Sequence, residues 1–163
     1  MAVRVLMVCL GNICRSPLAE GILQKKFSEK KIKGSVDSAG LINYHEGEHP
    51  DHRSISTARK HGIDISGQIS RMFKPEDLNN FDFIFAMDGN NFENLLEYAQ
   101  TKEHISKVHL LLGFAEMGHR RSVPDPYYGK LVDFETVFTL LDKACEIVAD
   151  KIKAHTSELN NTK

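Results

Sequence analysis

Residues 5–17 read Val-Leu-Met-Val-Cys-Leu-Gly-Asn-Ile-Cys-Arg-Ser-Pro and contain, in order, an apolar run, a short loop and the start of a helix. The nearly continuous apolar run over residues 3–8 predicts a strand that is buried on both faces. Ser16 and Pro17 are residue types favoured at a helix N-cap and at the first helical position. The sequence therefore predicts a loop that lies between a buried strand and a helix N-terminus.

This loop has the features of a binding site for a tetrahedral oxyanion. A helix N-terminus offers unpaired N–H groups and a positive partial charge. Gly11 and Asn12 tolerate the positive φ that a tight ring of inward-pointing amides requires. The planar Arg15 side chain can hold two oxygens of a phosphate, and the same positive field favours the nucleophilic thiolate form of Cys9.

Length and composition indicate an ordinary soluble globular protein, with one domain over residues 1–163. Of its 163 residues, 41% are hydrophobic and 26% are charged. The net charge of -1 argues against nucleic acid or a membrane as the main partner. No signal peptide or membrane-spanning segment is evident, and the three cysteines lack Cys-x-x-Cys spacing, so we expect a reducing, cytoplasmic location.

Hydrophobic periodicity along the rest of the chain predicts alternating strands and helices. We expect helices over about 17–31, after an N-cap at Asp51, as one turn over 75–78, over about 92–98 and from about Asp133, and strands over 35–40, 81–87 and 107–112. The polar residues after about 155 should be frayed. This order predicts an α/β fold, a three-layer α/β/α domain with a four-stranded parallel sheet. Ligands bind such sheets at the carboxyl ends of the strands, where Cys9 lies.

A second loop, Val-Pro-Asp-Pro-Tyr-Tyr-Gly at residues 123–129, precedes the final helix. Prolines on both sides of Asp125 keep this residue out of helical structure. Cleavage of a phosphate ester requires a proton for the leaving oxygen, which a carboxylic acid can donate. Tyr127 and Tyr128 offer flat walls for an aromatic leaving group, although this run alone would also suit a simple turn.

The spacing Cys-x5-Arg-Ser is that of protein tyrosine phosphatases, and the runs at 9–17 and 125–129 resemble their low-molecular-weight branch. The similarity extends over roughly residues 3–150. It implies hydrolysis of phosphotyrosine in proteins, or of other aryl phosphates, through a cysteinyl-phosphate intermediate with release of inorganic phosphate and no cofactor or metal. In this interpretation Cys9 is the nucleophile, Arg15 binds phosphate and Asp125 is the general acid.

The same resemblance implies further site residues. Hydrogen bonds from Ser16, Asn12 and Ser38 would hold the loop and the thiolate, Asp88 would support the site, and Tyr44 would line the substrate cleft where tryptophan is common. Gln68 stands near the position of a bracing histidine of the family, which is therefore replaced or missing here. The phosphate-binding loop would contain Leu10, Gly11, Asn12, Ile13, Cys14 and Ser16.

Two other functions share parts of this pattern. Thiol-dependent arsenate reductases use a similar fold and loop, but they need further cysteines on a mobile segment, and none occurs between residues 15 and 144. A phosphate-binding or phosphotyrosine-binding module without turnover would retain the loop. The presence of both Cys9 and Asp125 argues against that module.

Several other residues have a structural and a functional interpretation. Cys14 either packs beneath the helix or forms a reversible disulfide that protects an oxidised Cys9, whereas Cys145 lies in an apolar stripe and is expected to be a core thiol. The exposed tyrosine pair could mediate self-association, so we expect a monomer or a weak homodimer. A metal site could be assembled on spacing alone from His45, Glu46, Glu48, His49, Asp51 and His52, but a solvated loop explains them equally well.

Overall fold

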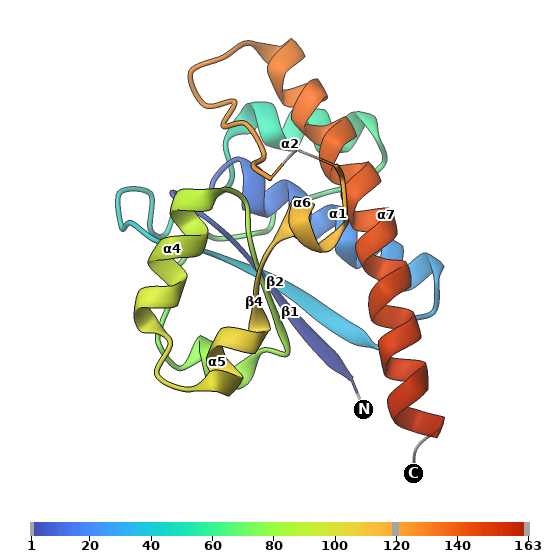
Figure 1. Ribbon diagram of the computed structural model, residues 1–163. Coiled ribbons are helices and arrows are strands. Elements are labelled where there is room, and N and C mark those ends of the chain that lie inside the picture. The colour runs from blue at the N-terminus through green and yellow to red at the C-terminus, as the bar shows by residue number, and fades with distance from the viewer. Residues whose placement is uncertain (1, 119–120, 162–163) are drawn as a thin grey trace.

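Four parallel strands form the centre of the protein in the computed structural model, which describes residues 2–118 and 121–161 (Figure 1). The strands are β1 (Val3–Cys9), β2 (Gly34–Gly40), β3 (Phe83–Ala86) and β4 (Val108–Leu110), in the order β2-β1-β3-β4. Strand β1 is central, pairing Val5 with Val36 on one side and with Phe83 on the other. The predicted four-stranded parallel sheet and three-layer α/β/α fold are confirmed.

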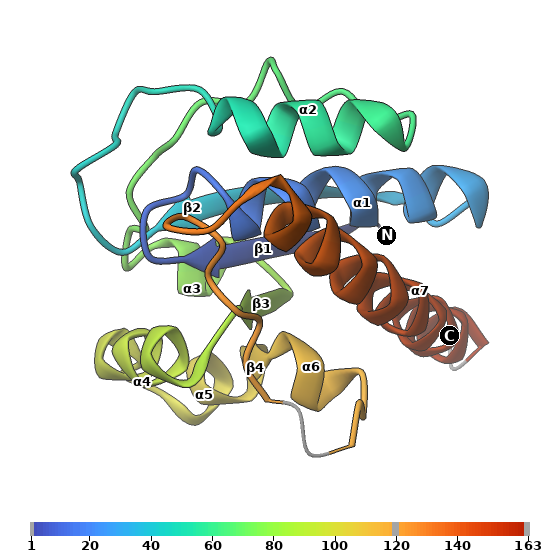
Figure 2. The same cartoon turned by 90° about the horizontal axis from the view of Figure 1, so that it is seen from above.

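Helices cover both faces of this sheet (Figure 2). The predicted helices are present, whereas α5 and α6 were not expected. The strand predicted over 107–112 is shorter, because the chain turns into α6 at Leu111. The helices are α1 (Arg15–Glu29), α2 (His52–Lys60), α3 (Asp77–Asn80), α4 (Gly89–Tyr98), α5 (Lys102–Lys107), α6 (Leu111–Phe114) and α7 (Leu131–Asn161).

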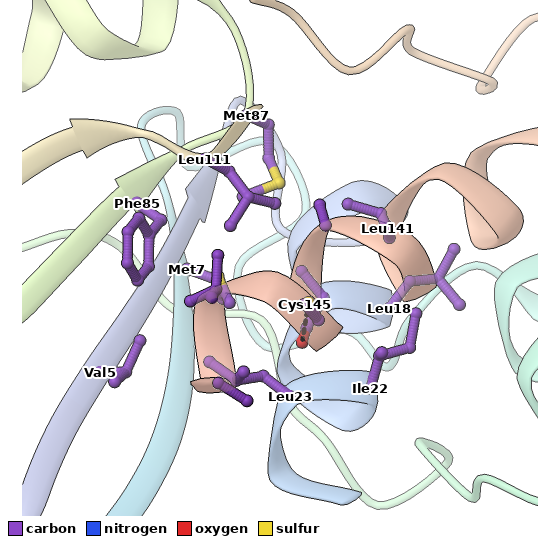
Figure 3. Close-up of a cluster of buried hydrophobic side chains, with 14 of the residues drawn as sticks. Val5, Met7, Leu18, Ile22, Leu23, Phe85, Met87, Leu111, Leu141 and Cys145 are labelled. Carbon is purple, nitrogen blue, oxygen red and sulfur yellow. Dashed lines mark hydrogen bonds between the residues drawn. The ribbon is translucent and has the colours of Figure 1, made fainter. Parts of the chain in front are cut away.

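Alternation along β1 divides the core into two layers. Val5 and Met7 face α1 and α7, where they pack with residues such as Leu23, as Figure 3 shows. Leu6 and Val8 point to the opposite face, toward α3 and α4. The expected apolar stripe of α7 is buried, as is Ile152 one turn after it. Burial on both faces fixes the register of β1, and hence the position of the loop that follows it.

Several helix boundaries differ from the sequence prediction, and the start of α1 and the end of α7 differ for identifiable reasons. Helix α1 begins at Arg15 with Cys14 as its N-cap, so Ser16 and Pro17 are its second and third residues. The Ser16 hydroxyl does not cap the helix because it takes part in a buried hydrogen-bond network beside Cys9. Helix α7 continues to Asn161, past the expected onset of fraying, and its last turns contain no proline or glycine to end it.

None of the helices within residues 2–118 and 121–161 has the length and apolar character needed to cross a membrane.

Candidate active site

A cleft opens at the carboxyl end of β1, as the topology of a parallel sheet predicts. It brings together segments that are far apart in the sequence, and in Figure 2 the segment after residue 120, in orange, runs past the end of β1. The residues that line the cleft are Cys9, Leu10, Gly11, Ile13, Cys14 and Arg15 from the phosphate loop, Ile42, Tyr44 and His45 from the segment after β2, and Asp125, Tyr127 and Tyr128 from the acid loop (residues 123–129).

The carbonyl groups of the phosphate loop (residues 9–15) bond to groups outside it. The Leu10 carbonyl accepts hydrogen bonds from the amides of Leu41 and Ile42, and the Gly11 carbonyl accepts one from the Ser70 hydroxyl. The Ile13 carbonyl accepts a hydrogen bond from the amide of Asp51. In a trans peptide the C=O and the next N–H point in opposite directions. The following N–H groups therefore point into the loop, where an oxyanion can accept their hydrogen bonds.

Cys9 is only 3% exposed, and its sulfur lies within this ring. The amide of Asn12 donates to Cys9 Sγ at 3.3 Å, and Ser16 Oγ lies 3.0 Å from the same sulfur. Because Asn12 Nδ2 donates to Ser16 Oγ at 2.8 Å, the serine proton is free to point at the sulfur. Hydrogen-bond donors of Asn12 and Ser16 thus surround the sulfur.

Asn12 and Gly11 of the phosphate loop differ in backbone conformation. Asn12 has the left-handed backbone that such a ring needs, with φ of 59°. Gly11 does not, and its requirement is space: a Cβ atom there would lie 3.2 Å from Cδ2 of His45. The prediction of positive φ is therefore confirmed for Asn12 and is wrong for Gly11.

Arg15 is buried and contacts three oxygen acceptors. Its Nη1 donates to Asp88 Oδ2 at 2.7 Å and to the Val123 carbonyl at 3.0 Å, and its Nη2 lies 3.7 Å from Asp125 Oδ2. Burial lowers the pKa of the guanidinium, but the negative charges of Cys9, Asp88 and Asp125 outweigh this effect and leave the pKa above its ordinary value. Arg15 therefore remains a cation next to the thiol.

Asp125 lies at the solvent-facing edge of the cleft, with its side chain 47% exposed. Its Oδ1 accepts a hydrogen bond from the Tyr127 amide at 3.1 Å, which shapes the acid loop locally. The start of this loop is held next to the end of β3, because the Val123 amide donates to the Met87 carbonyl at 2.7 Å. The carboxylate that the sequence proposes as an acid thus lies beside the proposed phosphate ligand.

Four rings form one wall of the cleft. Tyr127 and Tyr128 meet edge to face, with ring centroids 4.9 Å apart. His45 contacts Tyr44 at 4.7 Å and Tyr127 at 5.9 Å, so the imidazole connects the tyrosines of the two loops. Tyr128 and Tyr44 are 96% and 77% exposed, which leaves their faces available to an aromatic group.

The Ser38 hydroxyl does not make the hydrogen bond that the resemblance implies. Its hydroxyl donates to Glu20 of α1 at 2.7 Å, whereas the described groups around the thiol are Asn12 and Ser16. Burial, the largest effect, and the nearby Asp37 raise the pKa of Glu20 to about 7, although the Ser38 hydrogen bond opposes this shift. Ser38 therefore braces α1 against β2 because Glu20 offers it a close acceptor.

Gln68, which stands near the expected position of the family histidine, contacts α1 as well. Its Nε2 donates to the Pro17 carbonyl at 3.1 Å, while its Oε1 is buried and has no hydrogen-bond partner among the described groups. The loop network is instead connected through Arg71, whose amide donates to Asn12 Oδ1 at 3.1 Å. The Arg71 side chain in turn pairs with Asp37 and Asp77.

Two of the candidate metal-binding histidines have other hydrogen-bond partners. His45 Nδ1 lies 2.8 Å from Glu48 Oε2, and His49 Nδ1 lies 2.9 Å from the Gln68 carbonyl. Across residues 2–118 and 121–161, no three histidine, cysteine or acidic side chains are gathered as metal ligands.

The other two thiols are buried and free. Burial raises the pKa of Cys14 to about 12, and the charges of Asp51, Cys9 and Asp125 act in the same direction. Cys145 is fully buried, which raises its pKa further, and its sulfur faces the Ala19 carbonyl. Cys145 is therefore a core residue, as the apolar stripe predicts.

Sequence reasoning missed one residue that lines the cleft and one that bonds to its acid loop. His45 was considered only as a metal ligand, yet it connects the tyrosine wall. Arg53 was not singled out, although its guanidinium reaches the carbonyl oxygens of Tyr127 and Gly129. The only sequence signal near Arg53 is Asp51, which was correctly predicted to cap α2.

Comparisons with known proteins agree on one family. The model of the family described as low molecular weight phosphotyrosine protein phosphatase matches residues 4–158. The chain is 39% identical over 150 residues to the human low molecular weight phosphotyrosine protein phosphatase, covering 90% of this chain and 94% of that one. It is also 39% identical to a low molecular weight protein-tyrosine-phosphatase of Bacillus subtilis, covering 88% and 92%.

A solved structure agrees with these sequence matches. The protein tyrosine phosphatase of Entamoeba histolytica, crystallised with Hepes in its active site, superposes with a TM-score of 0.89 at 36% identity, over 95% of this chain and 99% of that one. The family match over residues 4–158 includes both loops of the cleft. The protein is an enzyme that hydrolyses phosphotyrosine, and it belongs to the low-molecular-weight phosphotyrosine protein phosphatase family.

Proposed function

We propose that this phosphatase works by a two-step covalent mechanism in which Cys9 is the nucleophile. The observation that carries the proposal is the convergence of three groups in one cleft: the buried Cys9 sulfur, the Arg15 cation and the Asp125 carboxylate, which lies 3.7 Å from Arg15. The Cys9 thiolate attacks phosphorus in line with the phenolic oxygen. Arg15 and the loop amides hold the equatorial oxygens and stabilise their charge in the transition state.

Asp125 completes both steps. As the P–O bond breaks, protonated Asp125 transfers its proton to the phenolic oxygen, and the phosphoryl group remains on sulfur. The carboxylate then accepts a proton from water as the water attacks phosphorus, which releases inorganic phosphate and regenerates the thiolate. Tyr44, Tyr127 and Tyr128 are the proposed contacts for the aromatic ring of the substrate.

The remaining site residues have supporting roles in this proposal. Asn12 and Ser16 orient the sulfur, Asp88 fixes Arg15, and the backbone of Leu10, Gly11, Ile13 and Cys14 binds phosphate. The whole chain, residues 1–163, acts as one phosphatase domain. We further propose a cytoplasmic location, and a monomer or a weak homodimer formed through the exposed tyrosine pair.

Two variants test the catalytic roles. Cys9→Ser should abolish hydrolysis of an aryl phosphate, because a serine hydroxyl is not ionised at neutral pH. Asp125→Ala should slow it by about 10²- to 10⁴-fold, the usual contribution of a general acid. Cys145→Ser and Asp64→Ala, which alter the same residue types outside the cleft, should keep near-parental rates. Full activity of Cys9→Ser or of Asp125→Ala would refute the corresponding role.

A burst experiment separates the enzyme from a binding module. Rapid mixing with p-nitrophenyl phosphate should release close to one equivalent of nitrophenol per site before the steady state, because the cysteinyl-phosphate forms faster than it hydrolyses. Stoichiometric binding of the substrate without nitrophenol release would instead indicate a phosphotyrosine-binding protein.

A further inference from the structure

The N-terminal turn of α2 connects the two loops of the active site. On one side, the Asp51 amide donates to the Ile13 carbonyl at 2.8 Å, and the Ser54 hydroxyl donates to the Cys14 carbonyl at 3.4 Å. On the other side, the Arg53 guanidinium reaches the acid loop. Both loops are therefore bonded to one rigid element, four residues long.

Arg53 makes the contacts to the acid loop with its forked guanidinium. Nη2 donates to the Tyr127 carbonyl at 2.9 Å and Nη1 donates to the Gly129 carbonyl at 3.1 Å. These two carbonyls lie two and four residues after Asp125 in the chain, while Arg15 holds the loop at Val123, two residues before Asp125. The acid loop is thus clamped on both sides of its carboxylate.

The Arg53 side chain is itself held in place. Asp51 accepts hydrogen bonds from Arg53 Nε at 3.0 Å and from Nη2 at 2.8 Å, and the guanidinium lies 4.5 Å above the ring of Phe134. Asp51 raises the pKa of Arg53 through these hydrogen bonds and its negative charge, and burial opposes this shift. A planar cation bonded on several edges has little freedom to move.

We propose that Arg53 is a positioning residue that holds Asp125 at the correct place for proton transfer to the leaving oxygen. This inference rests on the proposed role of Asp125 as general acid. Arg53 itself touches no reacting atom. Its two carbonyl contacts fix the backbone of residues 127–129, and proton transfer depends steeply on the distance between the acid and the leaving group. Loss of the fork should therefore weaken acid catalysis selectively.

The test compares leaving groups. A poor leaving group, such as the phenolate of phenyl phosphate, needs protonation as it departs, whereas 2,4-dinitrophenolate departs as the free anion. We expect Arg53→Met to lower kcat/KM for phenyl phosphate by about 10- to 100-fold, and kcat/KM for 2,4-dinitrophenyl phosphate much less. The ratio of these two values is independent of the fraction of active enzyme, so partial unfolding alone would leave it unchanged.

Three further variants complete the design. Arg59→Met, an exposed arginine on the same helix, should leave the ratio at the parental value. Arg53→Lys keeps the cation but loses the fork, so it should change the ratio in the same direction and serves if Arg53→Met does not fold. Asp125→Asn should change the ratio most, and adding Arg53→Met to it should cause no further change in the ratio.

The outcomes separate the two claims. If Asp125→Asn leaves the ratio unchanged, the assignment of the general acid is wrong, and the role of Arg53 is wrong with it. If Asp125→Asn changes the ratio but Arg53→Met and Arg53→Lys lower both rates equally or not at all, Asp125 is the acid and the positioning role of Arg53 is refuted. A selective loss in the Arg53 variants that disappears in the Asp125→Asn background supports the proposal.

Discussion

The Glu20 carboxyl should make the stability of the protein fall as the pH rises from about 4.5 to above 7. Burial and Asp37 raise its pKa from an ordinary value of 4.5 to about 7 in the folded protein. Between these values the folded protein retains a proton that the unfolded chain has released. The favourable contribution of protonated Glu20 is thus complete below the unfolded pKa and is lost as the pH rises through the folded pKa.

The structure gives the size of this effect. At 1.36 kcal/mol per pKa unit, the difference between 4.5 and about 7 corresponds to about 3 kcal/mol at pH 8. Glu20→Gln removes the charge, and its amide oxygen can still accept the Ser38 hydrogen bond. We therefore expect the variant to gain about 1 to 3 kcal/mol relative to the parent between pH 4.5 and pH 8.

Urea unfolding at several pH values measures this difference. The difference in unfolding free energy between Glu20→Gln and the parent should grow with pH, while contributions from unrelated groups cancel. Glu29→Gln, which alters an exposed glutamate of the same helix, is the matched control. Parallel stability curves for Glu20→Gln and the parent would refute the reasoning.

Three further predictions concern the other perturbed groups. Iodoacetamide should modify Cys9 much faster than Cys14 or Cys145, because burial raises the pKa values of the other two thiols. Mass spectrometry of the labelled peptides measures these rates, and equal labelling would contradict the prediction. Cys14→Ser should recover less activity with dithiothreitol after peroxide treatment than the parent does, because Cys9 can then no longer be protected as a disulfide; equal recovery would exclude this role. Burial lowers the pKa of His109, so its stabilising contribution is lost as the pH falls below about 6.5. In urea titrations, His109→Gln should reduce the loss of unfolding free energy below this pH. An unchanged loss would contradict the prediction.

The elements that sequence reasoning predicted well are those that bury a long apolar pattern. Strand β1 is buried on both faces and α7 on one continuous stripe, so hydrophobicity alone specifies them. Helix α5 contains no buried residue and α6 is a single turn, so neither leaves a periodic signal. The start of α1 was misplaced because Ser16 serves the thiol instead of the helix end.

The residues of the candidate site also fall into two groups, those predicted from local sequence and those that only the folded structure reveals. Cys9 and Arg15 share one loop, and prolines mark Asp125, so their roles follow from local sequence and from resemblance. Arg53 acts on carbonyl groups 74 and 76 residues away, and only the folded backbone places them beside it. The acceptor of the Ser38 hydroxyl was likewise decided by packing, because Glu20 comes close to it across β2 and α1.

The hydrogen bond from Arg15 to the Val123 carbonyl joins residues 108 positions apart. Contacts of such long range form late in folding, because closing a long loop costs entropy that only the assembled structure compensates. Hydrolysis of aryl phosphate should therefore report on complete folding. After dilution from denaturant, activity should return with the slowest structural phase, and helical signal should recover before it.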